Sequence, residues 1–266
     1  ATADFLARTA QGRADDLLTT ILLVARSPVV VCPAMNDLMW AHPQVQANAR
    51  HLGDALRYTV AGPVSGPLAA GEGEGAGRML EPWQIVEHVG RALETDPVFH
   101  GRRFLITAGP TREPVDPVRY LGNRSSGRMG YALAQAAWRR GGRVTLVSGP
   151  SALDAPEGVE RITVETACEM RDAVRDRLPE ADVSIFAAAV ADYRPAESRP
   201  GKVKRAREGD ELEIALTTNP DVAAGTRSHR KEGSVAVGFA LETEDLLENA
   251  RAKLESKGFD LLVAND

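Results

Sequence analysis

One segment of the chain combines residue types that bind phosphate with an unusual length. Residues 109–130, GPTREPVDPVRYLGNRSSGRMG, follow a short apolar run and lead into a helical stretch. A link from strand to helix rarely needs so many residues, so we expect this segment to hold a ligand. Ser125, Ser126 and Gly127 fall at the expected helix start, where N–H groups attract anions, serine suits the N-cap and glycine lets phosphate approach. The same residues also fit an ordinary capped helix.

Charged side chains downstream add to this chemistry. Asp192 ends a buried run, AAAVADYRP, where its carboxylate can bind a base amino group or a metal. Lys202 and Lys204 follow in GKVKR, and Lys253 and Lys257 stand four residues apart on one helix face. Each lysine pair alone is typical of solvated surface. Together with the helix start, these side chains suit a triphosphate and its Mg²⁺, and we expect them to form a single cradle.

Two familiar nucleotide motifs do not fit this segment. GNRSSGRM matches the first six places of G-x-x-x-x-G-K-[ST], but Arg128 and Met129 replace the lysine and the metal-binding hydroxyl. No G-x-G-x-x-G follows the apolar run, so the dinucleotide fingerprint is missing as well. The segment therefore predicts a phosphate site of another type.

The elements that position these residues alternate between strand and helix. This alternation predicts right-handed βαβ units and a mostly parallel sheet, with ligands at the carboxyl ends of its strands. ELEIAL alternates charged and apolar residues, which favours an antiparallel or edge insertion, and Asn219 in TTNPDV is placed to cap a helix. Strands are expected at RFLITAG, RVTLVSG, ITVE, VSIFAAAV, SVAVGFA and DLLVAND, and helices at 127–140, CEMRDAVRDRL and EDLLENARAKLES.

The first part of the chain is predicted to form a separate, smaller α/β domain. We expect a helix or helix pair over residues 1–25, a helix interrupted near Pro43 and a glycine-rich loop at LAAGEGEGAGRM. Strands are expected at PVVVCPAMN and YTVAGP, and a further helix at PWQIVEHVGRALE. PVFHGRR has the composition of a linker. The chain is therefore predicted to hold two domains, residues 1–97 and 98–266.

Composition narrows the class of protein. The chain has 266 residues, 43% of them hydrophobic and 26% charged, with a net charge of -5 that argues against a nucleic-acid surface. Cys32 and Cys168 are too few for a disulfide framework or a metal site. No stretch has the length of an apolar membrane span, and no basic-then-apolar leader opens the chain. We expect a cytoplasmic protein without membrane or nucleic-acid partners, and the two ends suggest a piece of a longer chain.

Taken as a set, the motifs closely resemble phosphopantothenate–cysteine ligase, the C-terminal half of the bifunctional bacterial coenzyme A biosynthesis protein. Residues 1–97 resemble its flavin-dependent phosphopantothenoylcysteine decarboxylase half through GRADDLLTT, PAMNDLMW and GRMLEPWQI. The resemblance implies a Rossmann-like, doubly wound, mostly parallel sheet in the ligase domain. Part of a flavodoxin-like α/β flavoprotein domain would precede it. It also implies a ligase homodimer, with larger homo-oligomers formed through the decarboxylase domain.

The implied ligase reaction has two steps. The carboxylate of 4'-phosphopantothenate attacks the α-phosphate of CTP, which gives an acyl-cytidylate and pyrophosphate. The amine of L-cysteine then displaces CMP. A carboxylate accepts an amine only after its oxygen becomes a good leaving group, and the triphosphate charge must be offset by Mg²⁺ and lysines. Eukaryotic relatives prefer ATP, so the choice of CTP is inherited from the resemblance.

The resemblance assigns residues to these roles. Asn123 corresponds to the asparagine that handles the acyl-cytidylate, and Lys202 to the catalytic lysine that contacts CTP. Asn36 corresponds to the asparagine that grips the decarboxylase substrate beside FMN. No metal ligand is assigned. The CTP-binding positions are Ser125, Ser126, Gly127, Ala188, Asp192, Lys202, Asn219, Pro220, Asp221, Val222, Phe239, Lys253 and Lys257.

The chain departs from the family in its first part. The family carries a proton-donating cysteine in a pattern like L-A-C-G, whereas this chain has Ala70, which cannot donate a proton. Segments that form most of the FMN pocket would precede residue 1, and a flap, a strand and a helix would follow LLVAND. Ala70 keeps open a non-catalytic, regulatory relative of the decarboxylase. A nicotinamide-dependent oxidoreductase is a third reading, against which the missing glycine fingerprint argues.

Overall fold

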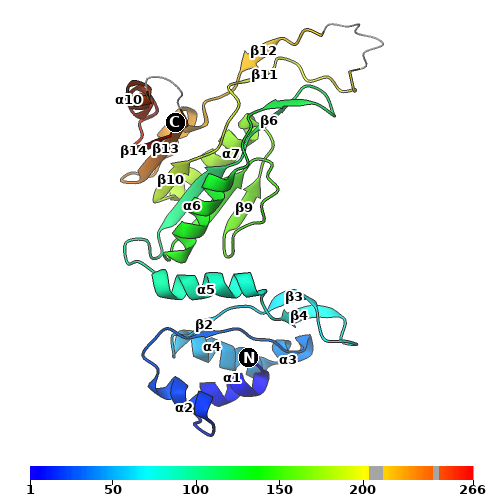
Figure 1. Ribbon diagram of the computed structural model, residues 1–266, viewed down its shortest axis with the longest axis vertical. Coiled ribbons are helices and arrows are strands. Elements are labelled where there is room, and N and C mark those ends of the chain that lie inside the picture. The colour runs from blue at the N-terminus through cyan, green and yellow to red at the C-terminus, as the bar shows by residue number, and fades with distance from the viewer. Residues whose placement is uncertain (204–211, 242–245, 266) are drawn as a thin grey trace. The chain divides into compact units, whose positions relative to one another are not determined.

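The computed structural model describes residues 1–203, 212–241 and 246–265. The chain divides into two compact units, Ala1–Thr95 and Asp96–Asp266 (Figure 1). Each unit has its own hydrophobic clusters, and each is described by itself.

Unit 1 is a small assembly of short helices and strands. A parallel pair joins β1 to β2, and an antiparallel hairpin joins β3 to β4. The predicted helix pair near the N-terminus and the break before Pro43 are both confirmed. The break occurs because proline fits the first turn of a helix, and His42 caps that helix through its ring nitrogen. The elements are α1 (Ala3–Ala10), α2 (Leu17–Val24), β1 (Val30–Val31), α3 (Asp37–Ala41), α4 (Pro43–Asp54), β2 (Thr59–Val60), β3 (Val64–Pro67), β4 (Glu74–Arg78) and α5 (Pro82–Glu94).

The predicted glycine-rich loop in unit 1 is wrong over its second half, which forms β4. The glycines serve close backbone approach there. A Cβ on Gly77 would lie 2.1 Å from the carbonyl oxygen of Met35, and one on Gly75 would lie 2.7 Å from Cβ of Asp37. Glycine in a strand often marks such an approach. The hairpin therefore packs directly against the loop that precedes α3.

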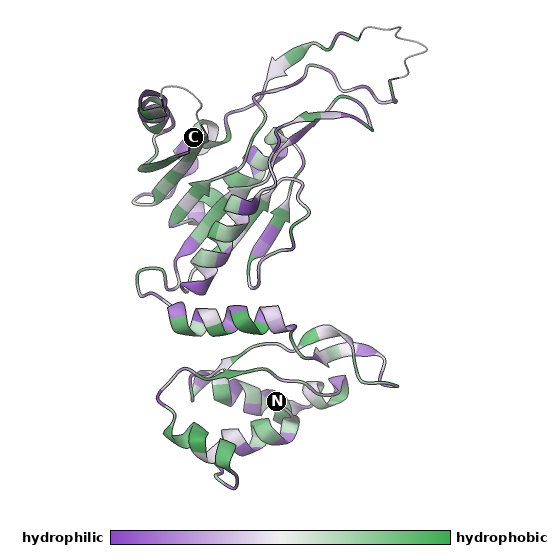
Figure 2. Cartoon of the chain, in the orientation of Figure 1, coloured by the Kyte–Doolittle hydropathy of each residue, from purple (hydrophilic) through white to green (hydrophobic). Residues whose placement is uncertain are grey.

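Helix α2 of unit 1 leaves most of its large apolar side chains exposed. Leu6, Val31, Val45 and Leu52 form the buried cluster of the unit, to which α2 contributes no member. Figure 2 shows α2 as a strongly hydrophobic element. Its exposed large side chains are Leu17, Leu18, Ile21, Leu23 and Val24.

Unit 2 is built on a six-stranded sheet in which every neighbouring pair is parallel, as the sequence predicts. The order is β14-β13-β10-β5-β8-β9, so the chain builds outward from β5 to one edge and then returns to β10 beside β5. This is the doubly wound order, and its switch point lies between β5 and β10. The strands are β5 (Arg103–Ala108), β8 (Arg143–Ser148), β9 (Glu160–Thr163), β10 (Val183–Phe186), β13 (Val235–Leu241) and β14 (Leu261–Asn265).

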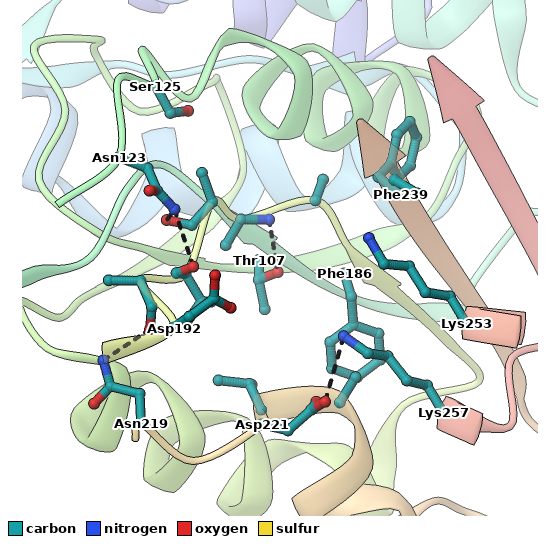
Figure 3. A pocket seen from close by; sticks show the side chains of 18 of the residues that line it. Thr107, Asn123, Ser125, Phe186, Asp192, Asn219, Asp221, Phe239, Lys253 and Lys257 are labelled. Carbon is teal, nitrogen blue, oxygen red and sulfur yellow. Dashed lines mark hydrogen bonds and ion pairs between the residues drawn. The ribbon is translucent and has the colours of Figure 1, made fainter. Parts of the chain in front are cut away.

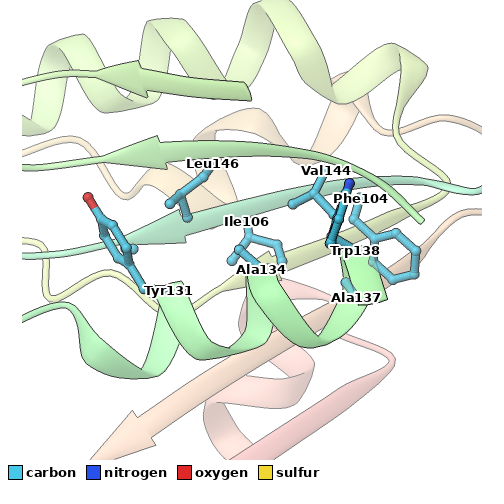
Figure 4. Close-up of a cluster of buried hydrophobic side chains, with 9 residues drawn as sticks. Phe104, Ile106, Tyr131, Ala134, Ala137, Trp138, Val144 and Leu146 are labelled. Carbon is cyan, nitrogen blue, oxygen red and sulfur yellow. The ribbon is translucent and has the colours of Figure 1, made fainter. Parts of the chain in front are cut away.

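Helices cover both faces of this sheet. Successive side chains of a strand point to opposite faces. Phe104 and Ile106 of β5 therefore pack with α6 on one face (Figure 4), while Leu105 packs with α7 on the other. Burial on both faces explains why the strands are continuously apolar runs. The helices are α6 (Arg128–Arg139), α7 (Ala167–Arg177), α9 (Val222–Thr226) and α10 (Leu246–Lys257), with short 3₁₀ turns η1 (Leu178–Glu180) and η2 (Arg227–His229).

Two antiparallel strand pairs leave the main sheet. β11 (Tyr193–Pro195) pairs with β12 (Leu216–Thr218), which confirms the predicted antiparallel insertion, although only the last residue of ELEIAL is in the strand. β6 (Arg112–Pro114) pairs with β7 (Tyr120–Gly122) inside the segment predicted to be a plain loop. Strand β10 ends at Phe186, four residues earlier than predicted. Those four residues leave the sheet and enter the site described next.

Candidate functional site

A cavity of about 800 Å³ lies at the switch point of the unit 2 sheet (Figure 3). Thr107 of β5, Phe186 of β10 and the residues that follow Phe186 form one side of it. Residues from α9 and α10 form the other side. Eleven residues predicted from the sequence line it: Asn123, Ser125, Ala188, Asp192, Asn219, Pro220, Asp221, Val222, Phe239, Lys253 and Lys257.

Both signs of charge face this cavity. Lys253 and Lys257 come from α10. Asp192 comes from the segment between β10 and β11, and Asp221 from the segment between β12 and α9. Lys257 Nζ lies 3.3 Å from Oδ2 of Asp221, whose other oxygen caps α9 by accepting from the Ala224 N–H at 2.9 Å. A lysine held by one carboxylate keeps further donors for an anionic ligand.

Two buried threonines fix the loop that forms the cavity floor. The N–H of Ala188 donates to Thr107 Oγ1 at 3.2 Å, and the N–H of Ala191 donates to Thr111 Oγ1 at 3.0 Å. Thr111 is fully buried, and its own N–H donates to the Ala189 carbonyl. Sequence reasoning missed both threonines, although both stand in the ITAGPT run that opens the long segment.

Asn123 is held on the wall of this cavity by the same loop. Its Nδ2 donates to the carbonyl oxygens of Ala189 at 3.3 Å and Val190 at 3.0 Å. The side-chain oxygen makes no hydrogen bond within the described residues. Because Nδ2 is used for positioning, Oδ1 is the atom that Asn123 presents to a ligand.

A second cavity, of about 580 Å³, adjoins the first and shares lining residues with it. Asn123, Arg124 and Ser125 line both cavities. Arg112 and Arg128 also line the second one, and no carboxylate does among the residues that the structure describes. The Arg112 guanidinium carbon lies 4.6 Å from the Tyr120 ring centroid, so the ring holds its plane. Three arginines and no carboxylate among the described lining residues make this cavity electropositive. The sequence motifs did not identify Arg112 as a residue of a binding site.

The start of α6 differs from the prediction of a serine cap. The N-cap is Gly127, with φ of 79° and no side-chain cap hydrogen bond. Ser125 instead accepts from the Gly127 N–H at 3.3 Å through its Oγ. A Cβ on Gly127 would lie 3.1 Å from Cα of Gly109, so both the left-handed φ and the contact require glycine. Ser126 lines the second cavity and not the first.

Asn219 does not cap a helix, contrary to expectation, because Asp221 is the N-cap of α9. Asn219 Nδ2 donates to the Ala191 carbonyl at 2.8 Å, and its Oδ1 accepts from Arg194 at 3.2 Å. The residue therefore ties the base of the β11–β12 pair to the cavity floor. Figure 3 shows this contact beside Asp192.

Lys202 is exposed and lines neither cavity, and Lys204 lies outside the described residues. The next residue, Val203, is buried and well anchored. Its N–H donates to Asp116 Oδ2 at 3.0 Å, and its carbonyl accepts from Arg119 at 3.2 Å. Lys202 is thus attached to the long 109–130 segment, while its side chain extends into solvent.

Asp116 makes this anchor possible. Burial would raise the pKa of the Asp116 carboxyl, but hydrogen bonds from three backbone N–H groups outweigh it and hold the pKa below its ordinary value. The carboxylate is therefore ionised at neutral pH. Since the pKa is lowered on folding, its stabilising contribution is present above the unfolded pKa of 3.8 and is lost as the pH falls through the folded value.

Asn36 belongs to unit 1 and is not among the residues that line either cavity. It caps α3 by accepting from the Leu38 N–H at 2.9 Å through Oδ1, which leaves Nδ2 to donate to a ligand. The preceding residue, Met35, is held by its N–H bond to the Gly77 carbonyl at 3.0 Å.

A bound Mg²⁺ would need ligand atoms from the substrate as well as from the protein. Among the described residues, no group of three or more His, Cys, Asp or Glu side chains is arranged to hold a metal ion. Mg²⁺ is commonly held by one or two carboxylates together with substrate phosphates and water. Asp192 and Asp221 in the first cavity fit that requirement. No helix in the described part of the chain has both the length and the apolar character needed to cross a bilayer.

The strand order and the lysine-bearing cavity at the switch point define a doubly wound α/β protein with a polar site at the carboxyl edge of its sheet. Residues 99–266 match the family model of the DNA/pantothenate metabolism flavoprotein C-terminal domain, and residues 1–94 match the Flavoprotein model. The chain belongs to the family of the coenzyme A biosynthesis bifunctional proteins, which confirms the resemblance seen in its motifs.

Similar proteins cover the whole chain. The coenzyme A biosynthesis bifunctional protein CoaBC of Vibrio vulnificus (strain YJ016) is 47% identical over 266 residues, and that of Escherichia coli (strain K12) is 46% identical over 267 residues. The alignments include 100% of this chain, which spans 66% and 65% of the lengths of those two relatives.

Solved structures match the second unit. The C-terminal domain of a CoaBC protein is 43% identical, with a TM-score of 0.55 over 63% of this chain and 78% of that one. A DNA/pantothenate metabolism flavoprotein from Streptococcus pneumoniae is 25% identical, with a TM-score of 0.55 over 62% of this chain and 82% of that one.

Proposed function

We propose that residues 98–266 ligate 4'-phosphopantothenate to L-cysteine at the expense of CTP, through an acyl-cytidylate. One observation carries the proposal: two cavities, one with lysines and carboxylates and one with arginines, meet at Asn123. A reaction that joins a nucleotide to a second phosphorylated substrate needs two such compartments with a shared wall.

The first cavity is suited to the nucleotide. Lys253 and Lys257 would offset the triphosphate charge, and Phe239 and Phe186 offer apolar surface for the base. Asp192 and Asp221 are the residues that would hold Mg²⁺. When bound, the ion would supply charge neutralisation for the pyrophosphate that leaves.

The second cavity is suited to the acyl substrate. Arg112, Arg124 and Arg128 offer guanidinium groups for a phosphate monoester at one end. The substrate's carboxylate would then reach the shared wall at Asn123, attack the α-phosphate and release pyrophosphate. In the second step the amine of cysteine, after losing a proton, forms the amide bond to the acyl carbon, and the bond from that carbon to the CMP oxygen breaks.

A stoichiometric assay tests the function. Mixing the chain with CTP, Mg²⁺ and 4'-phosphopantothenate should release pyrophosphate, and added cysteine should release an equal amount of CMP. No pyrophosphate, combined with retained binding of a protein partner, would favour the regulatory alternative, and tight binding of NAD would favour an oxidoreductase. We also propose a cytoplasmic location and a homodimer of the ligase domain, with larger assemblies formed through residues 1–97.

The family's decarboxylation chemistry does not fit unit 1. Ala70 is exposed in the turn between β3 and β4, at the place where the family carries its proton-donating cysteine. Asn36 remains available for a substrate carboxylate, and FMN belongs to the decarboxylase of the parent protein.

Lys257→Met should raise the KM for CTP by roughly 10- to 100-fold, because a charge-assisted contact to phosphate contributes about 1.5–3 kcal/mol. The matched control is Lys231→Met. Lys231 also pairs with an aspartate, Asp182, but at the amino end of β10. Initial rates against CTP check both variants. Equal changes in the two KM values would contradict the placement of the triphosphate beside α10.

Asp116→Asn should lower turnover by roughly tenfold, since a misplaced reacting group is costly even when the fold is intact. A carboxamide lacks the charge and presents an NH₂ group to the N–H groups that Asp116 now accepts, so the anchor of Val203 weakens. Asp176→Asn, on the exposed side of α7, is the control. Turnover at saturating substrate is compared between the two variants. Unchanged turnover in Asp116→Asn would argue against a role for the anchor of Val203.

A further inference from the structure

Arg230 does not line the first cavity, but it contacts residues that do. The residue follows η2 and is half-buried. Its guanidinium carbon lies 5.7 Å from the ring centroid of Phe186 and 5.6 Å from that of Phe259. The two rings are 5.6 Å apart at 45°, and both line the cavity. Arg230 therefore contacts both aromatic rings of the apolar wall without lining the cavity itself.

The same guanidinium holds the end of α10. Nη2 donates to the carbonyl of Lys257 at 3.2 Å, and Nη1 donates to the carbonyl of Gly258. The last carbonyls of a helix have no partner within the helix, and a cation is favourable at that end. Gly258 takes φ of 59°, and a Cβ there would lie 2.3 Å from the guanidinium carbon of Arg227. The end of α10 is thus closely packed as well as hydrogen-bonded.

Lys257 joins this support to the cavity. Its carbonyl is held by Arg230, while its Nζ reaches the cavity beside Asp221. A displacement of the last turn of α10 would carry the ammonium group with it. Within the described residues, Arg230 makes no hydrogen bond, ion pair or ring contact with β6, β7 or the start of α6, which line the second cavity.

We propose that Arg230 is a positioning residue for the nucleotide phosphates, which sets the place of Lys257 by holding the C-terminal end of α10 and the Phe186–Phe259 wall. The inference rests on the proposed function. It assigns to Arg230 an effect on one substrate only. A merely structural arginine would affect both substrates alike, and its effect would not depend on Lys257.

The test uses Arg230→Gln, Arg230→Lys, Lys257→Met and the double variant Arg230→Gln/Lys257→Met, with Arg143→Gln as control. Arg143 is exposed at the amino end of β8. Calorimetric titration with CTP should show a Kd about tenfold higher for Arg230→Gln and a smaller rise for Arg230→Lys, which keeps the charge but has a single donor nitrogen in place of the planar fork. The KM for 4'-phosphopantothenate should stay within twofold. The double variant should bind CTP no more than about threefold worse than Lys257→Met, because coupled residues are not additive.

Hydrogen exchange of residues 254–258 gives a readout that needs no nucleotide. Arg230→Gln should exchange faster there than Arg143→Gln does. An unchanged Kd, additive losses in the double variant or unchanged exchange would each overturn the proposal. If the parent chain binds no CTP, the proposed function fails, while exchange still decides whether Arg230 holds α10. Should Arg230→Gln not fold, Arg230→Lys carries the same comparisons.

Discussion

Replacing Asn123 with aspartate should leave pyrophosphate release largely intact and slow amide formation by roughly 100-fold or more, the scale reported for loss of one well-placed polar group at a reacting centre. Asn123 Nδ2 donates to the carbonyls of Ala189 and Val190. A carboxylate would face those two oxygens without a proton, so the side chain would turn away. The wall shared by the two cavities would then lose the group that we propose to hold the acyl-cytidylate.

The two steps separate because they use different parts of the site. In the proposed reaction pyrophosphate would leave from the lysine-lined cavity, whereas the amine would have to reach an acyl carbon at the wall that the two cavities share. Rapid quench with labelled CTP should show the acyl-cytidylate accumulating in Asn123→Asp. Gln135→Glu makes the same amide-to-carboxylate change on α6 away from both cavities, and should behave as the parent chain does. Equal loss of both steps would argue against this role for Asn123.

Lys202→Gln should lower turnover by roughly 100-fold, and Lys204→Gln far less. Lys202 immediately precedes Val203, which is fixed to the long segment through Asp116 and Arg119. Because the neighbouring backbone is anchored, we expect little loss of conformational freedom when the Lys202 ammonium moves to the bound phosphates, and a cation at developing charge contributes strongly to rate. Removing the charge leaves the anchor in place, so the folded state is preserved.

Turnover and thermal unfolding measured on both lysine variants decide between chemistry and stability. A large loss of rate with an unchanged melting temperature is the expected result for Lys202→Gln. Similar losses from the two variants would mean that the wrong lysine carries the role. Because Lys202 lines neither cavity in this structure, the assay also reports whether its side chain takes part once substrates are bound.

Local pattern predicted the regular elements well. Helix α5 begins and ends where PWQIVEHVGRALE does, and strands β5, β8, β13 and β14 match their predicted apolar runs to within one residue at each end, because hydrophobic periodicity is a property of neighbouring residues. Strand β9 begins two residues before the predicted ITVE, and β10 ends four residues early. The strands of the hairpins were harder to predict from the sequence. β4 is rich in glycine, and β6 and β7 are three residues each, so neither pattern stands out from a loop.

Motif identity and apolar spacing were enough to predict the family, the parallel α/β sheet and eleven of the residues that line the first cavity. Tertiary structure alone decided that Ser126 and Lys257 line different cavities, that Asn123 stands between them and that Arg230 supports α10. Such facts depend on which distant backbones come into contact, as Gly127 does with Gly109. These contacts result from strand order and from close approach of backbones, and neither produces a periodic pattern in the sequence.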